Sequence, residues 1–262
     1  MDHYCKNGLA HKVSGTVESV STLTRKQLLD FKNKDYGGGN ILISVVGDVE
    51  WSRVKDVIQK YLKNKPCAKP SLRLPGEYAS GYFLKRKADL QEAQYQLLYP
   101  ALPFEHPESS LQAVTSFVLG GNASAFLFER IREELGLCYG IYTRVNRFEG
   151  FNYVEISTGC SEKDLDYLHS EVLKIIEKMK TEKIDEERLE MVKASMLSSL
   201  YMSIESSSGL NSFLAMGYMK GERGDILAKR VQEIKAATAD QIREMAVRTF
   251  SVEPLRAELR GV

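Results

Sequence analysis

The sequence predicts an α+β fold, in which helices pack on one face of a mainly antiparallel sheet. Two observations predict it. Strand-like segments come in neighbouring pairs with helical segments between the pairs, which is the pattern of an α+β domain. The helical segments repeat apolar residues about every three to four positions, so each carries one apolar stripe. We therefore expect helices to cover one sheet face and to leave the other open.

The first seventy residues predict a helix, a strand and a second helix. Thr24 and Gln27 form a Thr-x-x-Gln capping-box pattern at the start of the first helix. The β-branched run of residues 41–47 predicts a buried strand, and a second helix is expected from about Glu50 to Leu62. Three elements are too few to close a core. We therefore expect Met1 to fall inside a longer domain, as in a truncated chain.

A polar segment with three prolines, residues 65–80, follows these elements. Proline-stiffened polar stretches of this kind are common linkers between domains. We therefore divide the chain into a partial first domain with its linker, residues 1–74, and a complete second domain, residues 75–262.

The second domain opens with strands at residues 82–87 and 93–99 and a helix at 108–119. A second helix is expected from Ser124 to about Leu135, and Gly136 ends it because glycine adopts a left-handed cap at little cost. The other expected elements are an antiparallel strand pair at 138–145 and 151–158, a helix at 165–179 capped by Ser161 and Asp164, helices at 185–205, 208–218, 226–235 and 239–249, and a closing strand at 255–260.

Composition narrows the functional class. The formal net charge is +1 with acidic and basic residues interspersed, so nothing favours a nucleic-acid or membrane surface. No apolar run approaches the roughly 20 residues of a membrane span, and residues 1–12 lack the apolar core of a signal peptide. The four cysteines form no Cys-x-x-Cys pair and are typical of reduced, mostly buried thiols in a soluble protein.

Four histidines occur, and none lies in a metal-binding pattern. His3 and His11 have no matched carboxylates, His106 lies in a loop, and His169 lies alone on the polar side of its helix. A catalytic zinc needs about three converging protein ligands, often two of them one helical turn apart. The sequence contains neither His-x-x-Glu-His nor His-Glu-x-x-His, and no Gly-x-Ser-x-Gly nucleophile turn. We predict no zinc site and no catalytic residue in this chain.

One segment, residues 128–139, combines side chains suited to substrate recognition. Arg132 lies near the end of a predicted helix and Tyr139 opens the next strand, so the turn between them can bring both side chains to one surface. Both donate hydrogen bonds, which suits recognition of a peptide carbonyl or an oxyanion. The spacing also allows a structural alternative, in which Arg132 pairs with Glu129 or Glu133 and Tyr139 is a half-buried core residue.

With its surroundings, this segment resembles the pitrilysin- or insulinase-type (M16) zinc peptidase family, which includes the mitochondrial processing peptidase and the core subunits of the respiratory bc1 complex. The family's second domain carries Leu-Gly-Gly, a serine-containing turn and Leu-Phe-x-x-(hydrophobic)-Arg-Glu-x-x-Gly-Leu-x-Tyr. Here these are Leu119 to Gly121, Ser124, and Leu127 to Tyr139. Residues 19–49 resemble the close of the family's first domain.

The resemblance implies an M16 peptidase-like fold of the LuxS/MPP-like metallohydrolase type, and zinc-dependent peptide hydrolysis. In that family one domain binds zinc, and the facing domain holds the peptide with an arginine and a tyrosine, here Arg132 and Tyr139. The zinc motif is absent from this chain, so we expect zinc on a missing upstream domain or a partner, and no activity from this chain alone. Ala125 and Phe126 replace a serine and an arginine of the family's turn, so the peptide contacts should not be identical.

Three explanations of the missing half stay open. The chain is a fragment of a longer peptidase, a non-catalytic subunit that completes a partner's site, or a catalytically dead assembly subunit like the bc1 core proteins. The expected partners are a peptide substrate and a zinc-bearing peptidase domain or subunit, or a second copy of the chain, because half a domain leaves an unpaired edge. The sequence determines neither the substrate nor the compartment.

Overall fold

The computed structural model describes residues 5–6, 11, 13–63 and 76–262. The chain divides into two compact units. We call Met1–Ala10, Pro75–Leu200 and Leu227–Val262 the sheet unit, and His11–Leu74 with Tyr201–Ile226 the helical unit. The predicted boundary at residue 74 lies outside the described residues and stays a prediction.

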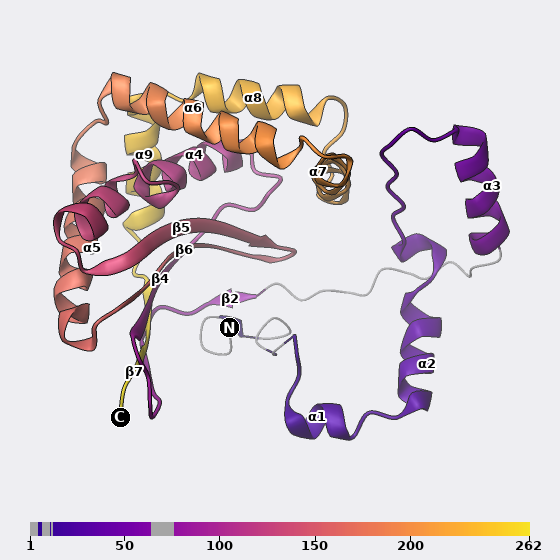
Figure 1. Cartoon of the computed structure of the whole chain (residues 1–262), viewed down its shortest axis with the longest axis horizontal. Helices are drawn as coiled ribbons and strands as arrows, with labels where there is room; N and C mark the ends of the chain where they lie inside the picture. Colours follow the sequence, from indigo (N-terminus) through magenta and orange to yellow (C-terminus); the bar gives the residue numbers. More distant parts are fainter. Residues whose placement is uncertain (1–4, 7–10, 12, 64–75) are drawn as a thin grey trace. The chain divides into compact units, whose positions relative to one another are not determined.

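The sheet unit is built on a five-stranded sheet with the strand order β3-β7-β4-β6-β5 (Figure 1). Only β3 and β7 pair in parallel, and the other neighbours are antiparallel. The predicted hairpin around Gly150 is confirmed, because Phe148 of β5 lies opposite Phe151 of β6. The strands are β3 (Gly81–Arg86), β4 (Ala93–Pro100), β5 (Cys138–Phe148), β6 (Phe151–Cys160) and β7 (Leu255–Arg260).

Helices cover one face of this sheet, as predicted. Figure 1 shows α4, α5 and α9 against the sheet, with α6 and α8 beyond α4 and α9. All five lie where the sequence predicts helices. They are α4 (Ser109–Gly120), α5 (Leu165–Thr181), α6 (Glu186–Ser203), α8 (Ile226–Ala236) and α9 (Ala239–Phe250). The α+β fold class is therefore confirmed.

The main core lies between the sheet and these helices. On β4 the alternate residues Tyr95 and Leu97 are fully buried, whereas Gln94 and Gln96 between them are exposed. This alternation follows from the strand period of two, which sends successive side chains to opposite faces. The helix-facing residues of β6 and the apolar stripe of α5 complete the same cluster.

A smaller apolar cluster lies on the other face of the sheet. It consists of Leu98, Phe151 and Leu255, with Tyr78 packed against them. Tyr78 belongs to β2 (Glu77–Tyr78), which pairs with β1 (Cys5–Lys6) in a two-stranded sheet. The predicted linker, residues 65–80, therefore contains the strand β2, and its residues 65–75 lie outside the described residues.

The helical unit forms the helices that the sequence predicts for it. It contains α1 (Val17–Ser21), α2 (Arg25–Asp35), the 3-10 turn η2 (Gly38–Asn40), α3 (Trp51–Leu62) and α7 (Ser207–Met219). The predicted capping box is confirmed: Gln27 N–H donates to Thr24 Oγ1 over 3.3 Å, and Thr24 N–H donates to Gln27 Oε1 over 2.8 Å. Neither α2 nor α3 contains a buried residue.

The prediction of a buried strand at residues 41–47 is wrong. Residues 41–46 belong to no helix or strand, and Leu42, Ile43 and Val45 are each more than two-fifths exposed. A strand is stabilised by its ladder and by cross-strand pairs, and none of the described strands pairs with this segment. The predicted side-chain capping of α5 is also absent, because Ser161 and Asp164 make no capping hydrogen bond.

Candidate functional site

Arg132 lies on a helix with an unusually wide turn. The predicted helix at residues 124–135 is a π-helix, η3, from Phe128 to Glu134. The amide of Leu135 donates to the carbonyl of Arg130 over 3.1 Å, five residues back instead of four. Short π-helical turns occur often at functional sites. Gly136 then ends the turn with a φ of +61°, the left-handed conformation that the sequence predicts for it.

Tyr139 lies in a β-bulge at the start of β5. Cys138 lies opposite Cys160 of β6, and the next regular pair is Ile141 with Thr158. Three steps along β5 therefore match two steps along β6, which leaves one extra residue on β5. A bulge of this kind re-aims the side chains beside it. The side chain of Tyr139 is 85% exposed.

The structure brings the two predicted site residues together on the surface. The Arg132 Cζ atom lies 5.7 Å from the centre of the Tyr139 ring and 4.7 Å from the centre of the Phe128 ring. Arg132 also forms an ion pair with Glu133 through Nη1, while its side chain stays 36% exposed. The two rings and one carboxylate therefore orient the guanidinium and leave part of it open to solvent. Cation–π contacts at exposed positions contribute about 0.5–1 kcal/mol each.

The structure agrees in part with each of the two interpretations that the spacing allowed, the recognition pair and the structural alternative. Arg132 makes its pair with Glu133, as the structural alternative predicts, but Tyr139 is not a half-buried core residue. Sequence reasoning missed Phe128, the second ring beside Arg132. Its position four residues before Arg132 was a signal for this contact, because residues so spaced lie on one side of a helix.

The pair also stands beside an open sheet edge. Among the described strands, β5 stands at the end of the strand order and pairs only with β6. An unpaired strand edge presents backbone N–H and C=O groups, to which an extended chain can add as a further strand. The arrangement can thus offer backbone pairing along β5 and side-chain donors at its start.

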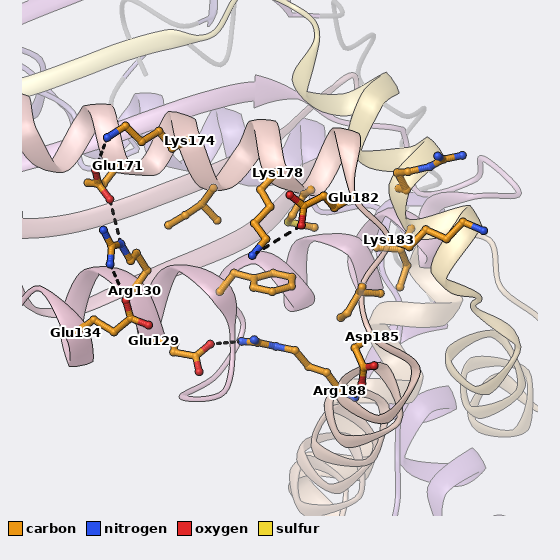
Figure 2. Close-up of a pocket in the computed structure, with 16 residues that line it drawn as sticks. Glu129, Arg130, Glu134, Glu171, Lys174, Lys178, Glu182, Lys183, Asp185 and Arg188 are labelled. Carbon is orange, nitrogen blue, oxygen red and sulfur yellow. Dashed lines mark hydrogen bonds and ion pairs between the residues drawn. The ribbon is translucent and has the colours of Figure 1, made fainter.

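A pocket of about 600 Å³ lies on another side of η3 (Figure 2). Its floor is apolar, with Ile175 and Met179 of α5 and Ile242 of α9 among its residues. Its rim carries six cationic and five carboxylate side chains, namely Arg130, Lys174, Lys178, Lys183, Arg188, Arg243, Glu129, Glu134, Glu171, Glu182 and Asp185. Neither Arg132 nor Tyr139 lines it.

The rim charges of this pocket largely pair with one another. The Glu171 side chain, only 4% exposed, accepts from Lys174 Nζ at 2.6 Å and from Arg130 Nε at 3.0 Å. Arg130 also donates to Glu134 over 2.7 Å. The hydrogen bond from Lys174, with the one from Arg130, lowers the pKa of Glu171. Glu171 is therefore held ionised, and it serves as an ion-pair partner and not as a general acid at neutral pH.

His169 is not on the polar side of its helix, contrary to the prediction. Its Nδ1 lies 2.7 Å from the hydroxyl of the fully buried Tyr95, and the ring is half-buried. Desolvation lowers the pKa of His169 to about 4 and raises that of Tyr95. The contact therefore joins a neutral imidazole to a neutral phenol inside the fold.

In the described part of the chain, no three histidine, cysteine, aspartate or glutamate side chains gather into a group that could hold a metal ion. His3 lies outside the described residues, and His106 Nδ1 accepts from the amide of Glu108 over 3.2 Å. Among the helices that the structure describes, none has the length and apolar character of a membrane span.

Comparison with known proteins gives consistent matches. Residues 22–196 match the family model described as the peptidase M16 inactive domain. An uncharacterized zinc protease of Rickettsia felis is 27% identical over 77% of this chain and 49% of its own length. The uncharacterized zinc protease YmxG of Bacillus subtilis is 24% identical over 95% of this chain and 60% of its own length. The chain thus spans about half to three-fifths of these relatives.

Solved structures show the same fold. A peptidase M16 inactive domain from Pseudomonas fluorescens superposes with a TM-score of 0.86 at 18% identity, over 100% of this chain and 63% of that one. A chain of complex III2 from Candida albicans gives a TM-score of 0.86 at 18% identity, over 99% of this chain and 64% of that one.

Proposed function

The chain belongs to the peptidase M16 family, whose inactive-domain model it matches, and from this premise we propose that it holds an extended peptide for a zinc site on another domain or subunit. The observation that carries the proposal is the exposed pair of Arg132 and Tyr139 at the start of the open edge strand β5. The reaction served is zinc-dependent hydrolysis of the peptide.

The side chains act as hydrogen-bond donors to the peptide. Arg132 is already oriented by Phe128 and Glu133, so binding a peptide carbonyl costs little further side-chain entropy. The Tyr139 hydroxyl adds a second donor from the bulge. The backbone of β5 pairs with the peptide as an added strand, which gives affinity without dependence on the peptide sequence. Arg132 and Tyr139 then fix which carbonyl lies at the start of the strand.

In this proposal, another domain or subunit binds the zinc. The described residues offer no group of three ligands for it, and the matched part makes up only 49% and 60% of the two relatives named as zinc proteases. We therefore assign the metal and the water-activating step to a further domain or a partner subunit, and derive no step through zinc for this chain. The chain by itself binds peptide and does not cleave it.

Peptide binding by the purified chain tests the proposal. Fluorescein-labelled peptides from a tryptic digest of casein serve as the probe, and fluorescence anisotropy measures the dissociation constant. Arg132→Ala should weaken binding about 10- to 100-fold, because it removes a charged hydrogen-bond donor. Tyr139→Phe should weaken it about 2- to 10-fold, because it removes one neutral hydrogen bond and keeps the ring.

Two variants control for general effects of losing an arginine or a hydroxyl. Arg243→Ala removes a surface guanidinium from α9, and Tyr167→Phe removes a hydroxyl from the half-exposed Tyr167 of α5. Both should bind like the unchanged chain. Equal losses in the control and site variants, or no binding by the unchanged chain, would rule out a peptide-holding role for Arg132 and Tyr139. Zinc content and peptide cleavage of the unchanged chain, measured with and without added zinc, should both be zero.

A structural or assembly role is the second candidate, and one observation favours it. The complex III2 chain from Candida albicans shares the fold along 99% of this chain, so this fold occurs in a chain of a protein complex. If the chain is a catalytically dead assembly subunit, Arg132→Ala and Tyr139→Phe change no peptide affinity. Size-exclusion chromatography would then find a defined complex with a zinc-bearing partner or with a second copy of the chain.

A further inference from the structure

Two free cysteines face each other across β5, the strand that carries Tyr139, and its neighbour β6. Cys138 of β5 and Cys160 of β6 are register partners, directly opposite each other in an antiparallel pair. Opposed residues on neighbouring strands send their side chains to the same sheet face. Cys160 is buried in the main core, and Cys138 packs against that core while remaining partly exposed.

The backbone geometry suits a covalent bond between them. Opposed residues of an antiparallel pair have Cα atoms about 4.5 or 5.5 Å apart, depending on whether they share hydrogen bonds. Both distances fall within the range of roughly 4.4–6.8 Å that disulfides span. Their Cβ atoms, about 4.5–5.5 Å apart in such a pair, must approach to about 3.5–4.5 Å, and the bulge that begins at Cys138 gives the strand room for this shift.

We propose that Cys138 and Cys160 are a thiol–disulfide pair, which a low-molecular-weight disulfide such as oxidised glutathione converts to a cross-strand disulfide. Closing this bond fixes the bulge from which Tyr139 projects. The pair stands apart from peptide binding, because neither thiol is part of the donor set formed by Arg132 and Tyr139. The alternative is that both cysteines serve only as small apolar core residues.

The reaction proceeds in two exchanges. The Cys138 thiolate attacks one sulfur of oxidised glutathione, whose S–S bond breaks and releases one glutathione thiolate. The Cys160 thiolate then attacks the Cys138 sulfur of the mixed disulfide, which releases the second glutathione thiolate. The two thiol protons leave to solvent and protonate the two released thiolates. The protein is oxidised by two electrons and the reagent is reduced by two.

Exposure sets the order of these steps. Cys160 is 2% exposed, so a reagent in solution reaches Cys138 first. Desolvation raises the pKa of both thiols, that of Cys160 to about 11, while Thr158 and the charge of Arg132 oppose the rise at Cys138. Because the thiolate is the reacting form, the closure should be slow at neutral pH and should accelerate as the pH rises from 7 to 9.

Disulfide mapping of the chain carrying Cys5→Ser and Cys67→Ser tests the proposal. This variant keeps only Cys138 and Cys160 of the four cysteines. After incubation with oxidised glutathione, digestion without reduction and mass spectrometry should find the two cysteine peptides joined, and dithiothreitol should separate them. The unfolding midpoint of the oxidised protein should rise by about 5–10 °C.

Single replacements separate the two steps. In the same background, Cys160→Ser should stop at a glutathione adduct on Cys138, and Cys138→Ser should leave Cys160 unmodified. The proposal is overturned if the variant with both thiols keeps a stable glutathione adduct on Cys138, forms disulfide-linked dimers, or does not react. Because the assay contains no peptide, its result is independent of the peptide-binding experiment.

Discussion

The sheet unit and residues 13–63 of the helical unit contain the same kind of amphipathic helix in different surroundings. In the sheet unit, α5 buries seven residues, among them the fully buried Leu168. In the other region, α2 and α3 bury none, and Trp51 is 70% exposed. An apolar stripe therefore predicts that a helix will seek an interface, but it does not say which surface covers it.

The same comparison separates local from non-local structure. A capped helix needs only its own residues, so α2 begins at its capping box although none of its own residues is buried. A strand needs a neighbour, and residues 41–47 have strand composition without a paired strand among the described residues. Local signals are thus sufficient for a helix, whereas a strand depends on a partner strand.

The largest expected effect comes from matched leucine replacements in the two regions. Leu168→Ala in α5 should cost about 2–5 kcal/mol in the free energy of unfolding, because it leaves a cavity in the core. Leu28→Ala in α2, where Leu28 is 56% exposed, should stay within about 0.5 kcal/mol. Both changes replace leucine by alanine in a helix, so differences in helix propensity cancel.

Urea unfolding followed by circular dichroism measures both variants. Trp51 is the only tryptophan of the chain and lies in α3, so its fluorescence reports on the helical unit separately. A large loss for Leu28→Ala would mean that α2 is covered in solution, and the contrast between the two regions would then fail.

Acid should lower the stability of the sheet unit. His169 has an ordinary pKa near 6.5, which desolvation lowers to about 4 in the fold. Between these values the unfolded chain binds a proton that the folded chain refuses, so stability falls as the pH drops from about 6.5 to 4 and then levels off. Each pKa unit corresponds to at most about 1.4 kcal/mol, and the half-buried ring should realise less than this.

The charged neighbours of His169 are Arg256, Glu258 and Asp166, of which the arginine opposes protonation and the two carboxylates favour it. His169→Gln should flatten the dependence of the unfolding midpoint on pH between 6.5 and 4. An unchanged pH profile in His169→Gln would show that another group causes the acid sensitivity.

Much of the fold could be predicted because its signals are local or periodic. The sequence predicts three such features that the structure contains: the strand pair around Gly150, the 3.6-residue period of α5 and the left-handed conformation of Gly136. The parallel pairing of β3 with β7 could not be predicted, because these two strands are far apart in the sequence, one near the start and one near the end of the domain. The buried contact between His169 and Tyr95 likewise joins residues 74 positions apart.

The candidate site, like the fold, could be predicted from the sequence only in part. The spacing of Arg132 and Tyr139 across one glycine turn was visible in the sequence, and the structure brings the two side chains together. The π-helical turn and the β-bulge were not visible in the sequence. Each contains one residue more than a regular helical turn or a regular strand pairing. The opposition of Cys138 and Cys160 depends on that bulge, so spacing alone could not reveal it.

A replacement at Gly136 tests how much the site depends on its turn. No atom lies within 4 Å of a Cβ built at Gly136, and its φ is +61°, so Gly136→Ala adds backbone strain without a clash. The cost should be about 1–2 kcal/mol in the free energy of unfolding. Gly136→Asn should cost less, because asparagine tolerates the left-handed region better than alanine. Equal costs would mean that the turn is not left-handed in solution.

The smallest expected effect makes the sharpest comparison, because the chain carries the same capping box in both regions. Thr238 and Gln241 cap α9 of the sheet unit as Thr24 and Gln27 cap α2. Thr238→Ala should lower the free energy of unfolding of the sheet unit by about 1 kcal/mol, because α9 is packed and its fraying loosens the core. Thr24→Ala should leave that free energy unchanged and lower only the protection of the first α2 amides in hydrogen exchange, since no buried contact of α2 transmits the loss.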